Sequence, residues 1–236
     1  MDEQFLRTAY LIGNDAVGRL QKSRVILFGV GGVGSYCAEA LVRAGVGNLT
    51  LVDPDTVSVT NLNRQLVALR STVGRKKVDV MRERALDICP TANVTALPLF
   101  YLPENADSLD LCEYDLVIDA IDTVAAKIEL AVRADAAGVP ILSSMGTGNK
   151  QFPERFEVTD IAKTEMCPLA RTMRRELRAR GVSHLRVVYS REEPMARHAD
   201  YADAREDGKL TPGTFSFVPG AAGLLLASEA IKLLLR

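Results

Sequence analysis

Four glycines follow the apolar run that ends at Phe28, in the segment GVGGVGS. Glycines at this spacing allow a tight turn, in which backbone N–H groups can approach a phosphate at the start of a helix. Asp53 ends the next apolar run, where its carboxylate can accept hydrogen bonds from ribose hydroxyls. These residues predict a nucleotide-binding loop that consists of Gly29, Gly31, Gly32 and Gly34.

The glycine turn alone also fits a nicotinamide-dependent dehydrogenase. Polar and charged residues that follow Asp53 in the sequence help to identify the nucleotide. Asn61 and Arg64 lie in the segment TNLNRQ, and Lys77 lies in GRKKVD. Cations there suit an enzyme that cleaves ATP, because negative charge redistributes over the phosphates as the bond breaks. Taken singly, Arg64 could form a surface ion pair and Lys77 could be a solvated helix residue. Their joint placement favours ATP.

A pair of carboxylates ends a later apolar run, in the segment DAIDT. The run predicts a strand, so Asp119 and Asp122 are expected at the carboxyl edge of the sheet, where such folds bind their ligands. Asp122 is a candidate Mg²⁺ ligand, since magnesium is held by one or two carboxylates together with substrate phosphates. A helix N-cap is the alternative role for Asp122. We include Thr123 among the expected nucleotide-binding residues.

The order of apolar and amphipathic segments predicts the fold. Short apolar runs alternate with segments of helical periodicity as far as residue 146. This alternation predicts a Rossmann-like, doubly wound α/β fold with a mostly parallel sheet. The strands are expected at 24–28, 48–53, 93–100, 114–122 and 139–146, and the helices at 35–44, 75–88 and 124–137.

Beyond residue 146 the alternation stops. The chain is therefore expected to consist of a nucleotide-binding core at 1–146, followed by a C-terminal extension at 147–236. A chain of 236 residues suits one domain with its own core. The extension is expected to hold an extended segment at 155–161, an arginine-rich helix, a charged loop at 191–210 and an apolar helix from Gly220.

Composition and charge narrow the classes of protein. Hydrophobic residues make up 47% and charged residues 25%, as in soluble globular proteins. The net charge of −1 gives no general attraction to nucleic acid. The four cysteines form no C-x-x-C pair, which argues against a zinc site or a disulfide framework and fits a reduced cytoplasm. The apolar C-terminal segment carries Glu229 and Lys232, so we expect a buried or interfacial helix and no integral membrane span.

The arginine-rich helix is a candidate RNA-binding surface. Its Leu169, Met173 and Leu177 can anchor an apolar face, and four arginines recur at i, i+3, i+4 and i+7. A face with one sign of charge favours contact with phosphates over a merely solvated helix. Cys167 lies just before this helix with no evident base, so a structural role is favoured over a catalytic one. The expected tRNA-binding residues are Arg171, Arg174, Arg175 and Arg178.

The motifs GVGGVGS, AGVGNLTLVDPDTVSVTNLNRQ, TVGRKKVDVM and DAIDT resemble those of the ThiF-type adenylyltransferases, which activate sulfur carriers, and of ubiquitin-activating enzymes. The resemblance covers about residues 7–145 and implies that a carboxylate attacks the α-phosphate of ATP, giving an acyl-adenylate and pyrophosphate. It also implies a homodimer, because Arg7 matches an arginine that reaches the neighbouring subunit's site, with 147–236 serving substrate and dimerisation. It assigns the nucleotide to Gly32 and Asp53, phosphates to Asn61 and Arg64, the triphosphate to Lys77, and Mg²⁺ to Asp122.

The second half narrows the resemblance to one branch of this family. The segments SSMGTGNK, FEVTDIAKTEMCPLARTMRRELRARGV, LRVVYSREEP and PGTFSFVPGAAGLLLASEAIK resemble the tRNA threonylcarbamoyladenosine dehydratases. The implied reaction closes the threonylcarbamoyl side group of a tRNA adenosine into a ring, with ATP as the dehydrating reagent. Activation of a ubiquitin-like sulfur carrier through its C-terminal glycine is the alternative, and a nucleotide-binding or sulfur-relay scaffold is a third. A bound monovalent cation and a sulfur-relay partner stay open.

Overall fold

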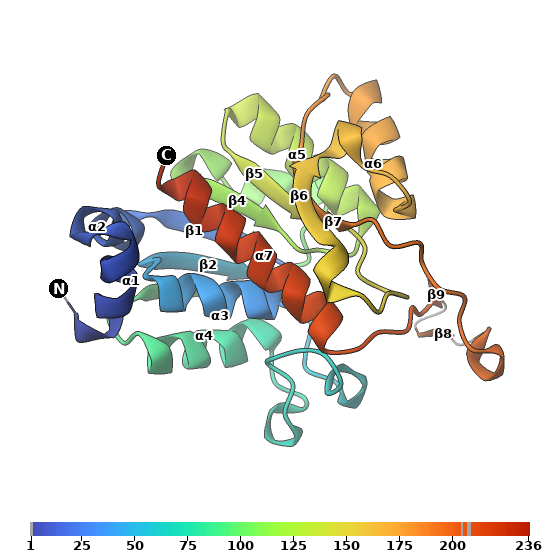
Figure 1. Cartoon of the computed structure of the whole chain (residues 1–236), viewed down its shortest axis with the longest axis horizontal. Helices are drawn as coiled ribbons and strands as arrows, with labels where there is room; N and C mark the ends of the chain where they lie inside the picture. Colours follow the sequence, from blue (N-terminus) through green and yellow to red (C-terminus); the bar gives the residue numbers. More distant parts are fainter. Residues whose placement is uncertain (1, 204, 207–208) are drawn as a thin grey trace.

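The computed structural model describes residues 2–203, 205–206 and 209–236, and Figure 1 shows a sheet flanked by helices. Part of the charged segment predicted at 191–210 lies outside the described residues. The strands are β1 Arg24–Phe28, β2 Asn48–Val52, β3 Asn93–Leu97, β4 Leu116–Asp119, β5 Ile141–Ser144, β6 Phe156–Asp160, β7 Arg186–Ser190, β8 Arg205–Glu206 and β9 Lys209–Leu210. The α-helices are α1 Leu6–Ile12, α2 Asn14–Lys22, α3 Gly34–Ala44, α4 Lys77–Ile88, α5 Val124–Ala137, α6 Pro168–Ala179 and α7 Phe217–Leu234.

The main sheet has the strand order β3-β2-β1-β4-β5-β7-β6. Every neighbouring pair in it is parallel except β6 with β7, which is antiparallel. The order reverses between β1 and β4, so the carboxyl ends of these two strands open a crevice of the kind in which doubly wound folds bind ligands. The doubly wound, mostly parallel α/β fold is confirmed.

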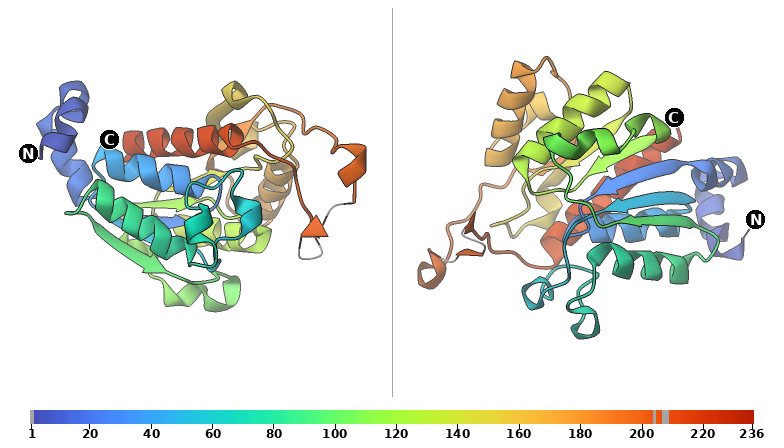
Figure 2. Two further views of the ribbon diagram at one scale, coloured as in Figure 1. Left: turned by 90° about the horizontal axis from the view of Figure 1, so that it is seen from below. Right: turned by 180° about the vertical axis from the view of Figure 1, so that it is seen from behind.

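Helices cover both faces of the sheet (Figures 1 and 2). Alternate residues of β1 enter different cores, because successive side chains of a strand point to opposite faces. Val25 and Leu27 join the core under α3, α4 and α7, whereas Ile26 and Phe28 join the core under α5. Helix α6 packs beside α5 and encloses a third cluster against β7. Both faces are therefore buried, as apolar strands such as RVILF require.

The predicted strands and helices are present, with ends that differ by a few residues, but the sequence reasoning missed β7. This strand pairs in parallel with β5, so the parallel arrangement continues past residue 146 and the expectation that the alternation stops there was wrong. Four of the five β7 residues are buried, as in β1, but RVVYS is followed by the charged residues REE and not by a glycine turn that marks the end of a strand. The expectation of an extended segment at 155–161 corresponds to β6, which closes the sheet edge.

Helix α7 is the apolar helix expected at the C-terminus, and it lies across α3 and the sheet (Figure 1). Among the described residues it is the one helix that is long and apolar enough to cross a membrane, with a mean hydropathy of 1.5. Half of that stretch is buried inside the protein. Ala222, Leu226 and Ala230 join the main core, and the buried carboxylate of Glu229 pairs with Arg186 of β7 at 2.5 Å. These contacts are those of a core helix.

Candidate nucleotide-binding site

The glycine turn between β1 and α3 leaves no room for side chains at two positions. Gly29 has a φ of +89°, and a Cβ there would lie 2.6 Å from the carbonyl oxygen of Ala120. A Cβ on Gly34 would lie 1.7 Å from the carbonyl oxygen of Gly29. The turn therefore packs directly on the chain that leaves β4. It presents the N-terminal N–H groups of α3 to the crevice, an arrangement that favours a phosphate.

Asp53, directly after β2, fixes this turn through hydrogen bonds to its carboxylate. Asp53 is buried, and its Oδ2 accepts a hydrogen bond from the backbone N–H of Val30 at 2.7 Å. Its Oδ1 accepts one from the N–H of Asp55 at 2.9 Å. Burial raises the pKa of the Asp53 carboxyl, against the opposing effect of the Lys77 charge. Each carboxylate oxygen keeps a lone pair that can accept from a ribose hydroxyl.

The loop after β2 meets the glycine turn. The Arg64 stem passes close to Gly32, since a Cβ there would lie 3.6 Å from Cγ of Arg64. The Arg64 guanidinium donates to the backbone oxygen of Thr60 at 2.9 Å and to Oδ1 of Asn63 at 3.0 Å. Asn61 is buried, and its Oδ1 accepts from the N–H of Ser58 at 3.1 Å. Arg64 thus lies beside the turn, whereas the contacts of Asn61 are within the loop, where its backbone carbonyl accepts from the N–H groups of Arg64 and Gln65.

Two residues that the sequence reasoning missed tie this loop to the turn. Ser35 donates its hydroxyl to the carbonyl of Gly31 at 2.6 Å and accepts from the N–H of Leu66 at 3.2 Å. Gln65 lies next to Gly31, and its buried Oε1 has no hydrogen-bond partner within the described residues. A buried amide oxygen without a partner is costly unless a ligand or water supplies a donor. A nucleotide in the crevice could supply one.

Lys77 is the first residue of α4 and is buried. Its ammonium nitrogen lies 2.7 Å from Oδ2 of Asp55, and its charge opposes the rise that burial causes in the pKa of Asp53. The burial is unusual for a lysine, which is seldom enclosed unless it is paired. Lys77 therefore places a cation at the carboxyl end of β2, near the aspartate predicted to bind ribose.

The loop after β4 supplies the candidate metal ligand. Asp122 is exposed, and its Oδ1 accepts one hydrogen bond from the hydroxyl of Thr123, at 3.4 Å. Within the described residues no three His, Cys, Asp or Glu side chains gather as a metal site would need. A magnesium ion here would take Asp122 as its carboxylate and phosphate oxygens as further ligands, which is an arrangement magnesium adopts.

Asp119, which the sequence places at the same edge, has a different environment. It is completely buried, and its Oδ2 lies 2.8 Å from the ammonium of Lys127 and 2.5 Å from the hydroxyl of Ser143. Lys127 also donates to the carbonyl oxygens of Ile121 and Ser144. Asp119 is therefore part of an internal network that braces the loop carrying Asp122. Sequence reasoning missed Lys127; a single lysine within the apolar helix segment VAAKIELAV was its signal.

Arg7 lies away from the other predicted residues. It is exposed on α1. Phe5, two residues before Arg7, packs against Gly45 at the C-terminal end of α3. The glycine turn is at the other end of that helix, which has 11 residues and is therefore about 16 Å long. Arg7 could meet a nucleotide in a neighbouring copy of the chain, but not the one bound at its own glycine turn.

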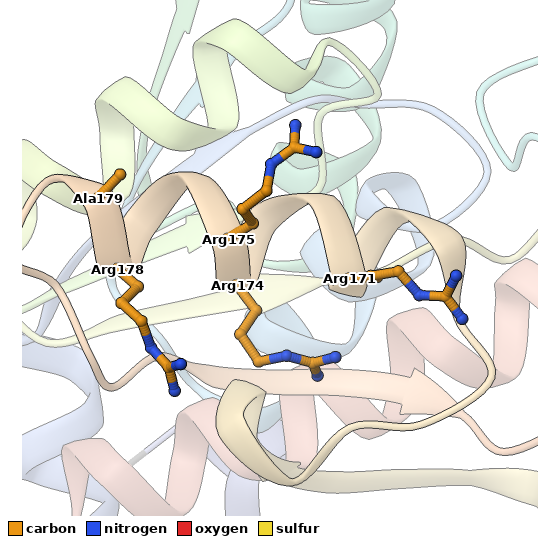
Figure 3. Close-up of a pocket in the computed structure, with 5 residues that line it drawn as sticks. All are labelled: Arg171, Arg174, Arg175, Arg178 and Ala179. Atoms are coloured by element: carbon orange, nitrogen blue, oxygen red, sulfur yellow. The ribbon is translucent and has the colours of Figure 1, made fainter.

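The four arginines of α6 line one hollow of about 430 Å³ with Ala179, but their guanidinium groups diverge (Figure 3). Arg174 is half-buried and donates to the carbonyls of Ile161 and Thr164 and to the Thr164 hydroxyl. Arg175 pairs with Glu176. Within the described residues the side chains of Arg171 and Arg178 form no hydrogen bond or ion pair, although their backbones do. Of the four predicted residues, these two are therefore the ones available to an RNA phosphate.

Cys167 precedes α6 and is enclosed by the third core cluster. Its Sγ lies near Gly146, and the residue forms the N-cap of the helix. A buried thiol is a poor nucleophile, because reaction requires an accessible thiolate. The structural role favoured for Cys167 fits this environment.

The doubly wound fold and the glycine turn are typical of nucleotide-binding proteins. The ThiF family model matches residues 5–236, and the chain belongs to that family. It is 42% identical over 245 aligned residues to the tRNA threonylcarbamoyladenosine dehydratase of Bacillus subtilis (strain 168), covering 100% of this chain and 96% of that protein. It is 41% identical over 143 residues to the molybdopterin-synthase adenylyltransferase of Escherichia coli (strain K12), covering 59% of this chain and 57% of that protein.

Solved structures of the E. coli tRNA N6-threonylcarbamoyladenosine dehydratase share the whole fold. The structure in complex with ATP has a TM-score of 0.86 at 34% identity and covers 98% of this chain and 93% of that chain. The structure in complex with AMP has a TM-score of 0.88 at 35% identity and covers 98% and 94%. The similarity includes the segments after residue 146, which carry α6, β7 and α7.

Proposed function

We propose that this chain is an ATP-dependent enzyme that dehydrates threonylcarbamoyladenosine in tRNA to its cyclic form. The observation that carries the proposal is the match to a dehydratase over the entire chain. The match to a sulfur-carrier activator covers 59% of the chain, so it accounts for less of the molecule. Arg64 and the start of α7 meet at Gly32 of the glycine turn, which supports adenylation as the chemistry.

In the proposed reaction, a carboxylate oxygen of the side group attacks the α-phosphorus of ATP. The bond to the bridging oxygen breaks, and pyrophosphate leaves. A nucleophile within the same side group then attacks the activated carbonyl, AMP leaves, and the ring closes with net loss of one water. Arg64 and Lys77 stabilise the charge that develops on the phosphates, and Asp53 orients the ribose. Gly29, Gly31, Gly32 and Gly34 bring the backbone N–H groups to the phosphates, with Asn61 and Thr123 beside them.

Magnesium belongs to this proposal through Asp122. Bound there, it would neutralise negative charge on the triphosphate. The chain's own part is to hold the exposed Asp122 carboxylate at the crevice, which the network of Asp119 and Lys127 does from inside the fold. A bound monovalent cation stays a further prediction for this site.

The partners follow from the same assignment. Arg171 and Arg178 would contact tRNA phosphates, while Arg174 braces α6. A homodimer is proposed because Arg7 is exposed and far from its own glycine turn, so that it could complete a neighbour's site. A cytoplasmic location is proposed from the tRNA substrate, and a sulfur-relay protein is kept as a further partner.

The test is incubation of the protein with Mg·ATP and tRNA, with and without the threonylcarbamoyl group. AMP and pyrophosphate should appear with the modified tRNA, whose mass should fall by one water. Arg64→Ala and Asp122→Asn should each lose about 10²–10³-fold in rate, because such groups stabilise transition-state charge. The matched control is Arg70→Ala, an exposed arginine farther along the same loop. Release of ADP, or AMP formation only with a ubiquitin-like protein, would refute the proposal.

A further inference from the structure

Two exposed phenylalanines stack at the start of α7. The ring centroids of Phe215 and Phe217 lie 5.2 Å apart, and the ring planes differ by 8°. Both residues are half exposed, at 52% and 50%. Stacked aromatic rings left open to solvent are unfavourable in a free protein, since each forgoes burial of its apolar surface. The pair is therefore a candidate contact for a flat apolar ligand.

The pair lies close to the glycine turn. Pro219, two residues after Phe217, packs against Gly32, where a Cβ would lie 3.2 Å from Cβ of the proline. The Arg64 stem passes the same glycine. The start of α7 thus lies against the glycine turn, where the α-phosphate is proposed to bind, and the two rings belong to residues only two and four positions before Pro219.

Hydrogen bonds on two sides fix the segment that carries the rings. Asn63, next to Arg64, donates its side-chain amide to the carbonyl of Thr214 at 3.2 Å. From the loop after β5, Asn149 donates its N–H to the carbonyl of Gly213, and Gly213 donates its N–H to Oδ1 of Asn149, both at 2.7 Å. Asn149 adopts a φ of +57°, a conformation that asparagine tolerates better than most residues. The backbone directly before Phe215 is therefore held by hydrogen bonds from two loops, the one after β2 and the one after β5.

We propose that Phe215 and Phe217 form a stacking platform for the nucleobase of the RNA substrate, an inference that rests on the proposed function. The reacting carboxylate belongs to a side group attached to that base, so the base must lie within one side group of the α-phosphate. Proteins recognise bases splayed out of RNA loops by stacking them on aromatic side chains. Two half-exposed rings suit one base, whereas a protein interface needs about 800 Å² on each partner.

The test uses leucine variants, which keep apolar bulk but remove the aromatic face. Phe215→Leu/Phe217→Leu should weaken binding of threonylcarbamoyl-tRNA by about 10- to 100-fold, because a stacked base contributes on this scale. Phe217→Tyr should retain wild-type binding. The affinity for Mg·ATP, measured by calorimetry, should stay unchanged in all variants. Phe100→Leu is the matched control, since Phe100 is 53% exposed and follows the edge strand β3.

A second readout reports stacking itself. In an RNA stem-loop with 2-aminopurine in place of the target adenosine, the fluorescent base should be quenched on binding to the wild type and to Phe217→Tyr. With the double leucine variant, at concentrations that saturate binding, quenching should be lost. Unchanged tRNA affinity and quenching in the double variant would overturn the proposal. A change from dimer to monomer in sedimentation would assign the rings to a second copy of the chain instead.

Different results would refute the stacking platform and the proposed dehydration. If the wild type quenches the base and binds tRNA but forms no AMP with the modified tRNA, the stacking platform stands and the proposed dehydration falls. If the wild type forms AMP with modified tRNA and the leucine variants do so with unchanged KM for tRNA, the function stands and the platform falls.

Discussion

The buried pair of Lys127 and Asp119 offers a sharp test of how the fold supports the site. Replacing Lys127 by methionine keeps the length of the side chain and removes its charge. Asp119 would then keep the hydroxyl of Ser143 and the N–H of Ile121 as partners but lose the cation 2.8 Å away. The carbonyl oxygens of Ile121 and Ser144 would lose a donor as well.

The magnitude follows from complete burial of both side chains. Breaking a buried pair by removing one partner typically costs about 3–5 kcal/mol, because it leaves an uncompensated charge. With an entropy of unfolding of about 2.1 cal/mol/K per residue, a chain of this length should lose about 6–10 °C in Tm. Removing both charges in Asp119→Asn/Lys127→Met should recover much of that loss, since no unpaired ion is left.

The assay is chemical denaturation and thermal melting of wild type, both single variants and the double variant. Lys22→Met is the control, because Lys22 is exposed at the end of α2 and should change stability by less than about 0.5 kcal/mol. We expect a large coupling free energy of unfolding between Asp119 and Lys127. Strictly additive losses, or a Lys127→Met variant as stable as the control, would refute it.

Mixing Arg7→Ala with Asp122→Asn subunits should restore about a quarter of wild-type activity, because about half of the dimers become heterodimers and each of these has one intact shared site of two. No recovery after mixing would place Arg7 outside the site. Changing Arg171 and Arg178 to glutamine should make the salt dependence of log Kd for tRNA shallower by about one to two units, since each phosphate contact releases counterions. An unchanged slope would assign both to solvent. Asp53→Asn should gain stability relative to wild type as pH rises above about 4, the ordinary carboxyl pKa. Burial raises the pKa of Asp53 in the folded state, so the folded wild type loses stability as this carboxyl group ionises above that pH. Melting curves between acid and neutral pH test this, and a gain independent of pH would contradict it.

The strands and the glycine turn of residues 1–146 could be predicted, because a few adjacent residues are enough to identify each of them. Apolar runs such as RVILF and NLTLV are strands wherever both faces of a sheet are covered, and the glycine turn needs no distant residue to be recognised. The strand β7 was missed because its burial depends on β5 and β6, which lie more than twenty-five residues away along the chain. The separate roles of the arginines in α6 were likewise unpredictable, since the carbonyls that Arg174 binds belong to the preceding segment.

The site residues that sequence reasoning missed share one property: their role arises from contacts between loops. Gln65 and Ser35 matter because the loop after β2 folds back on the glycine turn. Pro219 matters because α7 returns to Gly32 from the far end of the chain. No spacing rule encodes such contacts, so the motif residues could be predicted while the residues that position them could not.

Four aspartates near the carboxyl ends of β2 and β4 show how burial divides one residue type among several roles. Asp119 is enclosed and paired with Lys127, so it can only brace the loop. Asp53 is buried with two backbone donors and shapes the glycine turn while keeping lone pairs for a ribose. Asp55 is exposed and holds the buried Lys77, whose ammonium would exchange this partner for a phosphate in the proposed function. Asp122 is exposed with a single weak hydrogen bond, which leaves its carboxylate free to bind a metal ion. The chemistry of the crevice therefore depends less on how many carboxylates line it than on which of them the fold has already satisfied.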